Sequence, residues 1–124
     1  LSEKKILFAE DSAFFRNQVK GFLEEEGFTV ITAEDGVEAM AQLQEHADEI
    51  TLLLTDLEMP NMDGFELTKT IKSDPRFSHL PVIALTSLAG DADIAKGKLV
   101  GIDSYQIKLD RENMIQEVKN YFYR

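Results

Sequence analysis

Short apolar runs alternate with longer segments of helical periodicity along the whole of this 124-residue chain. Each run has the length of a strand, and the segment after it repeats its apolar residues every three to four positions, as an amphipathic helix does. This alternation is typical of βαβ units around a buried parallel sheet. The expected strands are Ile6 to Ala9, Phe28 to Ala33, Ile50 to Thr55, Val82 to Thr86 and Ser104 to Ile107.

The segments after the runs predict five helices, and together with the strands they define an α/β fold of the doubly wound (βα)5 type. The fourth, Asp91 to Val100, has a thin apolar face and is interrupted by Gly90 and Gly97, so we expect it to be the most mobile. Each of the other four has an apolar face and a cap or a stop. The first has Phe15, Val19, Phe22 and Leu23 on its face and ends near Gly27. The second is capped by Asp35 and has Gly36, Met40, Leu43 and Ala47 on its face; the third is capped by Asp63 and has Leu67 and Ile71; the last is capped by Asp110 and has Met114, Ile115, Val118, Tyr121 and Phe122.

The charge balance limits the kinds of partner that this domain can bind. With 13 Lys and Arg against 23 Asp and Glu, the formal net charge is −10, which repels phosphate backbones and argues against direct nucleic-acid binding. No stretch approaches the roughly 20 apolar residues that span a bilayer, and no signal-peptide pattern is present. We therefore expect a single cytoplasmic domain, residues 1–124, with no direct contact to a membrane. Without cysteine, it forms neither disulfides nor thiolate metal sites.

Polar side chains follow the strands at the points where the strands end. Because ligands of doubly wound folds bind outside the carboxyl ends of the strands, these side chains are expected to form one site. The residues are Glu10 and Asp11 after the first run, Asp56 after the third, Thr86 and Ser87 at the end of the fourth, and Lys108 after the fifth.

Three acids in one place need a cation. Two carboxylates about 4 Å apart repel by roughly 4 kcal/mol at an effective dielectric of about 20. Mg²⁺ offsets this repulsion, because it prefers a few carboxylates together with waters, a carbonyl and a phosphoryl oxygen. With the metal and Lys108 neutralising an incoming phosphoryl group, Asp56 can attack phosphorus and form an acyl phosphate. The Thr86 hydroxyl can then donate to a phosphoryl oxygen, which would make the site a switch.

The stretches "ILFAEDS", "TDLEMPNMDG", "VIALTS" and "DSYQIK" resemble the receiver domain of two-component response regulators, the family of the chemotaxis protein CheY. The resemblance covers nearly the whole chain and implies a flavodoxin-like sheet of order 2-1-3-4-5. It implies that Asp56 takes a phosphoryl group from the phosphohistidine of a histidine kinase. It further implies Mg²⁺ bound by Glu10, Asp11, Asp56 and the Glu58 backbone carbonyl, phosphoryl binding by Thr86 and Lys108, Tyr105 as the switch aromatic, and the fourth helix, fifth strand and fifth helix as output face.

Such a domain is a signalling module rather than an enzyme, with only self-phosphorylation and self-dephosphorylation as chemistry. The stretches "DLEMPNMDGF", "LPVIALTSLAG" and "YQIKLDRE" look most like receivers of chemotaxis hybrids, namely CheA-type kinases or CheV-type coupling proteins. The expected partners are therefore a histidine kinase and a downstream chemotaxis or signalling protein, or a covalently linked kinase or coupling domain. The start at Leu1 rather than Met agrees with excision from a longer protein.

The chain departs from the family pattern at a few positions. Leu109 stands where the family has a proline joined by a cis bond, and a cis bond to a non-proline residue costs roughly 3 kcal/mol, so the Lys108–Leu109 bond is either trans or strained. Ser87 replaces a smaller residue after the switch threonine. Glu58 and Leu88 occupy positions that tune self-dephosphorylation.

Three other functions compete with this interpretation. A haloacid-dehalogenase-type phosphatase also uses an Asp nucleophile with Mg²⁺, but it wants a second Asp where this chain has Glu58. A flavodoxin-like FMN binder wants a phosphate loop rich in Ser, Thr and Gly, whereas Glu10 and Asp11 would repel the phosphate. A receiver that acts only as a phosphorylation-independent interaction module would not need all five key side chains.

Several residues also have simpler structural interpretations. Tyr105 alone is compatible with a half-exposed strand aromatic, and Asp63 and Gly64 with a cap and turn. The remaining ones are Phe14 and Arg16, which either flank the site or face solvent; His46 and His79, expected at the surface; Glu24, Glu25 and Glu26, expected on a solvated helix face; and Met59 and Met62, expected to pack in a loop.

Overall fold

The computed structural model describes residues 4–87, 90–108 and 110–123. Its five parallel strands form one sheet in the order β2-β1-β3-β4-β5, which confirms the predicted fold class and strand order. No strand boundary differs from the expected one by more than a residue, because the apolar runs end in polar residues that mark the sheet edge. The strands are β1 (Lys5–Ala9), β2 (Thr29–Ala33), β3 (Ile50–Thr55), β4 (Val82–Thr86) and β5 (Ser104–Ile107).

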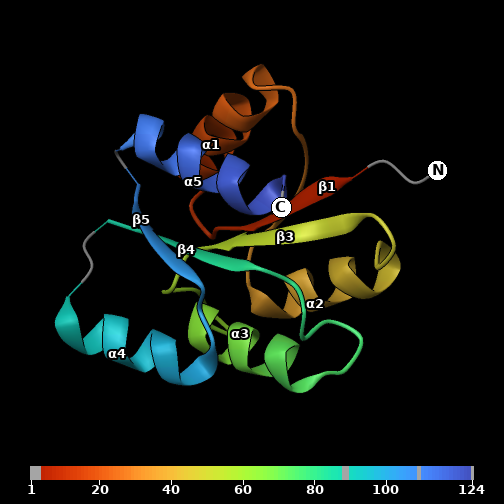
Figure 1. Cartoon of the computed structure of the whole chain (residues 1–124), viewed down its shortest axis with the longest axis vertical. Coiled ribbons are helices and arrows are strands. Elements are labelled where there is room, and N and C mark those ends of the chain that lie inside the picture. The colour runs from red at the N-terminus through yellow and green to blue at the C-terminus, as the bar shows by residue number, and fades with distance from the viewer. Residues whose placement is uncertain (1–3, 88–89, 109, 124) are drawn as a thin grey trace.

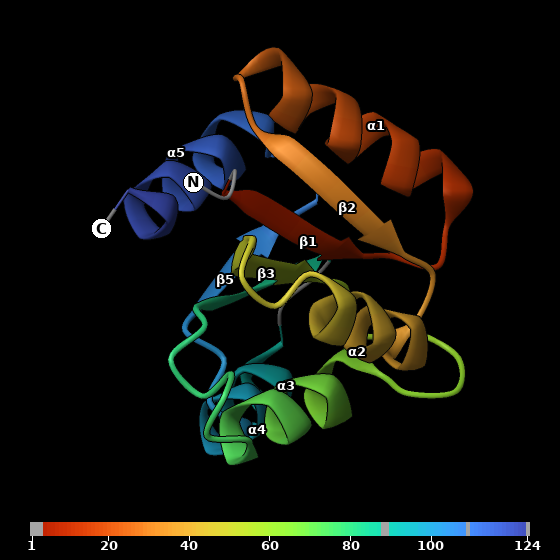
Figure 2. The ribbon, with the colours of Figure 1, turned by 90° about the vertical axis from the view of Figure 1, so that its right-hand side faces the viewer.

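The helices cover both faces of this sheet. Helices α1 (Ala13–Glu25) and α5 (Arg111–Phe122) lie on one face, and α2 (Gly36–Glu45), α3 (Gly64–Ser73) and α4 (Asp91–Val100) lie on the other (Figure 1). Figure 2, turned by 90°, shows β2 beside β1 and the two helical layers on either side of the strands. Across the described part of the chain, no helix combines the length and apolar content needed to cross a bilayer.

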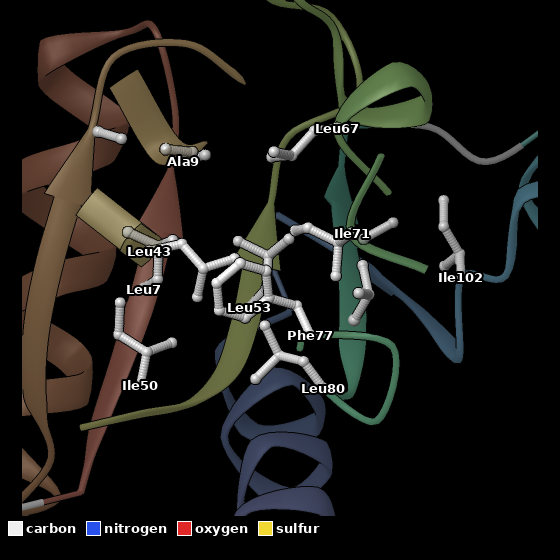
Figure 3. Packing of buried hydrophobic residues seen from close by; sticks show 14 of the residues in the cluster. Leu7, Ala9, Leu43, Ile50, Leu53, Leu67, Ile71, Phe77, Leu80 and Ile102 are labelled. Carbon is white, nitrogen blue, oxygen red and sulfur yellow. The ribbon is translucent and has the colours of Figure 1, made fainter. Parts of the chain in front are cut away.

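The alternation of side chains along each strand builds two separate apolar cores. In β1, Leu7 points toward α2 and α3, whereas Phe8 points toward α1 and α5, and both are fully buried. Strand β1 is paired with β2 along its full length and with β3 on its other side, where the register shifts between Lys5 and Ile6, so β1 lies in the interior of the sheet. Figure 3 shows the first core, with Leu7, Ala9, Leu43, Ile50, Leu53, Leu67, Ile71, Phe77, Leu80 and Ile102 labelled.

Side-chain caps start four of the five helices. Asp35, Asp63 and Asp110 accept hydrogen bonds from the backbone N–H three residues further on, as the sequence predicts, and Ser12 caps α1 in the same way. Helix α4 begins at Gly90 without a side-chain cap. Gly97 is its only buried residue. The mobility expected of α4 stays a prediction.

One detail of the helices was predicted wrongly, and another was predicted incompletely. Ala47 was placed on the apolar face of the second helix, but α2 ends at Glu45 and Ala47 is exposed in the turn that leads to β3. The glutamates at the end of α1, Glu24, Glu25 and Glu26, are exposed as predicted, but two of them also form ion pairs that the sequence did not reveal. Glu25 accepts from Arg111 at 2.6 Å and Glu26 from Lys119 at 2.7 Å, so they tie α1 to α5. Sequence periodicity does not reveal which neighbouring helix supplies a cation.

Candidate functional site at the carboxyl edge of the sheet

The carboxyl ends of the strands open into a cleft of about 650 Å³. Its walls come from the ends of β1, β3, β4 and β5 and from the first turns of α3 and α4, although these segments are far apart in the sequence. Parallel strands place their carboxyl ends at one edge, which is why the residues after them meet. The cleft is lined by Asp11, Asp56, Leu57, Glu58, Met59, Phe65, Thr86, Ser87, Asp93 and Lys108.

The three predicted acids lie together at this cleft. Glu10, Asp11 and Asp56 each offer a carboxylate oxygen, and these oxygens all lie within 4.8 Å of one another. Glu10 and Asp56 are 1% and 7% exposed, whereas Asp11 is open to solvent. Octahedral Mg²⁺ holds its oxygen ligands at about 2.0–2.1 Å, so opposite ligands are about 4.2 Å apart. The three carboxylates thus supply hard oxygen donors close enough together to form part of a site for such an ion.

Lys108 neutralises the buried acids from inside the protein. Its Nζ lies 2.7 Å from Oε1 of Glu10 and 3.4 Å from Oδ2 of Asp56. The same ammonium lies 4.8 Å from the centre of the Phe15 ring, a cation–π contact. The backbone N–H of Lys108 donates to the carbonyl of Thr86 at 2.8 Å, which ties the end of β5 to the end of β4.

The protonation of this pair follows from its surroundings. Burial raises the pKa of Glu10, and the hydrogen bonds from Lys108 and from the Ser12 N–H only partly oppose that effect. For Lys108, burial lowers the pKa, but the hydrogen bond to Glu10 and the charge of Asp56 outweigh it and leave the pKa raised. Lys108 therefore stays protonated, and the main effect of desolvation is the raised pKa of the Glu10 carboxyl group.

The backbone around Asp56 holds its carboxylate in place. The Asp56 N–H donates to the carbonyl of Ala9 at 2.9 Å, and Oδ1 accepts from the Leu57 N–H at 2.8 Å. Gly64 presses against this segment, because a Cβ atom there would lie 2.2 Å from the Asp56 carbonyl oxygen. The sequence suggested only a turn at Gly64. Its absent side chain in fact permits the close approach of α3 to the strand end.

Thr86 and Tyr105 occupy neighbouring positions on the same face of the sheet. Thr86 is 9% exposed at the end of β4. Tyr105 pairs with Ala84 in the β4–β5 register and is half-buried against the first core. Its hydroxyl donates to the backbone carbonyl of Asp93 in α4 at 2.9 Å. Tyr105 is thus packed and hydrogen-bonded rather than a simple exposed strand aromatic.

The loop after Asp56 is fastened to the start of α2 by contacts that the sequence did not reveal. Asn61 has a φ of +67°, and its Nδ2 donates to Oδ2 of Asp35 at 2.7 Å. The Gly36 N–H donates to the carbonyl of Met62 at 2.9 Å. The only sequence signal for this arrangement is the Asn itself, because Asn tolerates the left-handed region better than most residues. These contacts fix the loop that carries Glu58.

The structure locates the residues whose position the sequence left open. Arg16 flanks the site, because its guanidinium donates to the Glu10 carbonyl at 2.9 Å, whereas Phe14 is 70% exposed. His46 pairs with Glu49 at the surface, and His79 is exposed. Within the described ranges, the acids after β1 and β3 are the only group arranged to hold a metal ion. As expected, Met59 and Met62 pack against the first core.

Two predictions fall on residues outside the described ranges. Leu109, with the peptide bond that joins it to Lys108, is one of them, and Leu88 is the other. The replacement of the family's proline by Leu109 is a fact of the sequence. The structure places the Lys108 ammonium between the two buried acids.

A (βα)5 domain with an acid cluster, a hydroxyl and a lysine at one sheet edge belongs to the class of phosphoacceptor signalling domains. The sequence profile of the response regulator receiver domain matches residues 6–119, and the chain belongs to that family. It is 35% identical over 114 residues to the chemotaxis protein CheY1 of Helicobacter pylori, covering 91% of each chain. It is 30% identical to CheV3 of the same species, covering 94% of this chain and 40% of that protein.

Solved structures agree with this assignment. The CheY chain in the CheX–CheY–BeF3–Mg²⁺ complex of Borrelia burgdorferi superposes with a TM-score of 0.88 at 28% identity, covering 99% of this chain and 92% of that one. The chain is thus a receiver domain of the CheY type, with a phosphoacceptor role in chemotaxis-type two-component signalling. The phosphatase, flavin-binding and phosphorylation-independent alternatives are not favoured by these relatives.

Proposed function

We propose that Asp56 is the phosphoacceptor and that it takes its phosphoryl group from a phosphohistidine of a histidine kinase. One observation carries the proposal: the Asp56 carboxylate lies in the cleft beside both a cation and two further acids. Oδ2 of Asp56 is 3.4 Å from Nζ of Lys108, and the oxygens of Glu10 and Asp11 lie within 4.8 Å. This combination suits a nucleophile that receives an anion, because the cation reduces the repulsion between them.

The transfer step conserves atoms and charge. A carboxylate oxygen of Asp56 forms a bond to phosphorus while the bond between phosphorus and the imidazole nitrogen of the donor breaks. The electron pair of that bond stays on the imidazole, which takes up a proton from solvent. Asp56 thereby changes from a carboxylate to an acyl phosphate, and its side chain gains negative charge. This gain of charge is the signal that the rest of the domain has to detect.

The acid cluster is proposed to hold Mg²⁺. The donors are carboxylate oxygens of Glu10, Asp11 and Asp56 and the backbone carbonyl of Glu58, a set of hard oxygens of the kind that this ion prefers. When bound, Mg²⁺ neutralises charge on the phosphoryl oxygens. Asp11 is the most accessible of the acids, and Glu58 lines the cleft. Glu10 is engaged on both oxygens, by Lys108 and by the Ser12 N–H.

Lys108 and Thr86 are proposed to bind the phosphoryl group once it has arrived. Lys108 already faces Asp56, so added negative charge there draws its ammonium toward the phosphoryl oxygens. Thr86 lines the same cleft at the end of β4 and can donate its hydroxyl. When Thr86 moves toward the phosphoryl group, Tyr105, on the same face of the sheet, turns inward. The output surface consists of α4, β5 and α5. The alternative outputs are a separate chemotaxis protein and a kinase or coupling domain of the same polypeptide.

We further propose that self-phosphorylation and self-dephosphorylation are the only reactions of this cytoplasmic domain, and that residues 1–124 form a single receiver domain. The match to CheV3, of which this chain covers 40%, supports an origin in a larger coupling protein. The match to CheY1, of which it covers 91%, supports a free-standing regulator. Both origins leave the chemistry at Asp56 unchanged.

The decisive experiment is intact-mass analysis after incubation with acetyl phosphate and Mg²⁺. We expect one phosphoryl adduct on the native chain and none on Asp56→Asn. The matched control is Asp48→Asn, which removes the same charge from an exposed position outside the cleft and should be modified like the native chain. An adduct that persists on Asp56→Asn would remove this residue from its role. Turnover of many phosphate esters per site would instead indicate a phosphatase.

Metal binding is tested separately by thermal unfolding at increasing Mg²⁺ concentration. A ligand that binds only the folded state stabilises it by about 2.7 kcal/mol at a hundred times its dissociation constant. The native chain and Asp48→Asn should both gain stability with Mg²⁺, whereas Asp11→Asn should gain much less. Equal gains in all three would show that the ion acts on the overall net charge and not on the cleft.

A further inference from the structure

Helix α4 carries a glycine where the helix interior would favour almost any other residue. Gly97 is buried in the second turn of this helix, and glycine there costs about 1 kcal/mol relative to alanine. The structure gives a packing reason. A Cβ atom built on Gly97 would lie 1.4 Å from the hydroxyl oxygen of Tyr105 and 2.5 Å from its Cζ. The missing side chain thus forms a notch, which we call the Gly97 notch, and the tip of Tyr105 fills it.

The hydroxyl of Tyr105 is held in this notch by the helix itself. It donates to the backbone carbonyl of Asp93 at 2.9 Å. Asp93 and Gly97 are four residues apart, so they lie one above the other on the same face of α4. The phenol therefore contacts α4 through one hydrogen bond and one close approach on adjacent turns. We call this arrangement the docked orientation of Tyr105.

The docked orientation is connected to the cleft in two ways. Asp93, whose carbonyl accepts from Tyr105, lines the cleft together with Asp56 and Thr86. Tyr105 also pairs with Ala84, and side chains two residues apart in a strand point to the same face, so Tyr105 and Thr86 lie on the same side of the sheet. Tyr105 is therefore joined to the cleft through Asp93, and Thr86 lies on the same face of the sheet as the phenol ring.

We propose that Gly97 is a positioning residue that holds Tyr105 in the docked orientation and thereby sets how strongly the domain responds to a phosphoryl group. The second half of this statement rests on the proposed function of Asp56, Thr86 and Tyr105. Any side chain at position 97 occupies the notch and displaces the hydroxyl toward solvent. Because coupling between two sites is reciprocal, a variant that disfavours the docked orientation must also bind a phosphoryl mimic more weakly, if that mimic favours it.

The first test measures the position of Tyr105 without any ligand. Labelling with 3-fluorotyrosine introduces three fluorine probes, at Tyr105, Tyr121 and Tyr123, and the Tyr105→Phe variant assigns the Tyr105 signal by ¹⁹F NMR. Burial and the charge of Asp93 raise the pKa of Tyr105. In Gly97→Ala we expect this signal to move toward that of an exposed tyrosine and its pKa to fall toward the ordinary value. An unchanged signal with an unchanged pKa would overturn the proposal.

A matched control separates the notch from the general effect of replacing a helical glycine. Gly21 lies within α1, and a Cβ atom there meets nothing within 4 Å. Gly21→Ala should therefore stabilise the fold and leave the Tyr105 signal in place. If Gly97→Ala proves too unstable to study, the Tyr105→Ala background provides the measurement. In that background Gly97→Ala should be neutral or stabilising in urea unfolding, and an equal loss in both backgrounds would contradict a specific contact with Tyr105.

The second test concerns the response and uses beryllofluoride with Mg²⁺ as the probe. We expect Gly97→Ala to lower its apparent affinity by at least about fivefold, the lower end of typical couplings between sites, while Gly21→Ala leaves it unchanged. Displacement of Tyr105 with unaltered affinity would refute the coupling. Failure of the native chain to bind the probe would refute the proposed function instead, and the notch would then be judged from the fluorine signal and the double-mutant comparison.

Discussion

The Lys108 ammonium lies 2.7 Å from Oε1 of Glu10, a carboxylate that is only 1% exposed. These residues are separated by almost the whole chain and meet because both follow parallel strands. Lys108 thus serves as a counterion within the site and reduces the repulsion between the clustered acids. The same lysine faces Asp56 at 3.4 Å, so the cation that offsets the buried charge of Glu10 also lies where added charge would appear.

Replacement of Lys108 by methionine should destabilise the fold, since it leaves the Glu10 carboxylate buried without its cation. Breaking a fully buried pair costs about 3–5 kcal/mol, and because this one borders an open cleft we expect about 2 kcal/mol. Urea unfolding at pH 7 measures the loss. The control is Lys119→Met, which breaks the exposed pair with Glu26 and should have little effect. Similar losses in the two variants would show that burial of the Glu10 pair is energetically unimportant.

The raised pKa of Glu10 predicts a specific dependence of stability on pH. Between its unfolded value, near 4.5, and the higher folded value, the folded state binds more protons than the unfolded state. The contribution of Glu10 is therefore fully present below about pH 4.5 and is lost as the pH rises through the folded pKa. Glu10→Gln keeps the shape of the neutral acid, so we expect it to be at least as stable as the native chain at pH 7.

The measurement is the free energy of unfolding in urea at several pH values from 4 to 7.5. Other acids with lowered pKa values, such as Asp74, titrate in both proteins and cancel in the difference. The difference between Glu10→Gln and the native chain should grow in favour of the variant as the pH rises. Loss of the Mg²⁺-dependent gain in the variant is expected as well. A difference independent of pH would place the titration at another residue.

The sequence predicted the topology and the meeting of the strand ends, because both follow from local periodicity. Asp35, Asp63 and Asp110 were recognised as caps since capping depends only on residues three positions apart. The contacts between Glu10 and Lys108, Phe15 and Lys108, and Asn61 and Asp35 were missed. They depend on how side chains turn once the strand ends have met, and no short-range pattern encodes that choice.

Glycines show the same limit. Gly97 was noted only as an interruption of a weak helix, whereas the structure shows the Tyr105 hydroxyl in the space that a side chain would take. Ala47 was wrongly assigned to the helix because its spacing continues the apolar stripe, yet α2 ends two residues earlier. Periodicity describes the residues on one element. It does not describe the partner that an absent or extra methyl group would meet.

Replacement of Phe15 by leucine should slow phosphorylation with little effect on the fold. The Phe15 ring lies 4.8 Å from Nζ of Lys108, and exposed cation–π contacts contribute about 0.5–1 kcal/mol, a factor of about two to five in rate if the contact holds the ammonium in place. Adduct formation with acetyl phosphate measures that rate. Phe22→Leu is the control. Phe22 lies on the same helix as Phe15 and makes a similar cation–π contact, but with Arg111. Equal slowing in both would exclude a specific role for Phe15.

Asn61 should influence metal binding through the backbone of the loop that carries Glu58. Its φ of +67° is a left-handed conformation that costs most side chains roughly 1–2 kcal/mol, and its amide also donates to Asp35 at 2.7 Å. Asn61→Ala loses both advantages, whereas Asn61→Gly loses only the hydrogen bond. We therefore expect alanine to lower both stability in urea and Mg²⁺ affinity more than glycine does. If glycine is as harmful as alanine, the hydrogen bond to Asp35 fixes the loop, and the backbone conformation of Asn61 contributes nothing further.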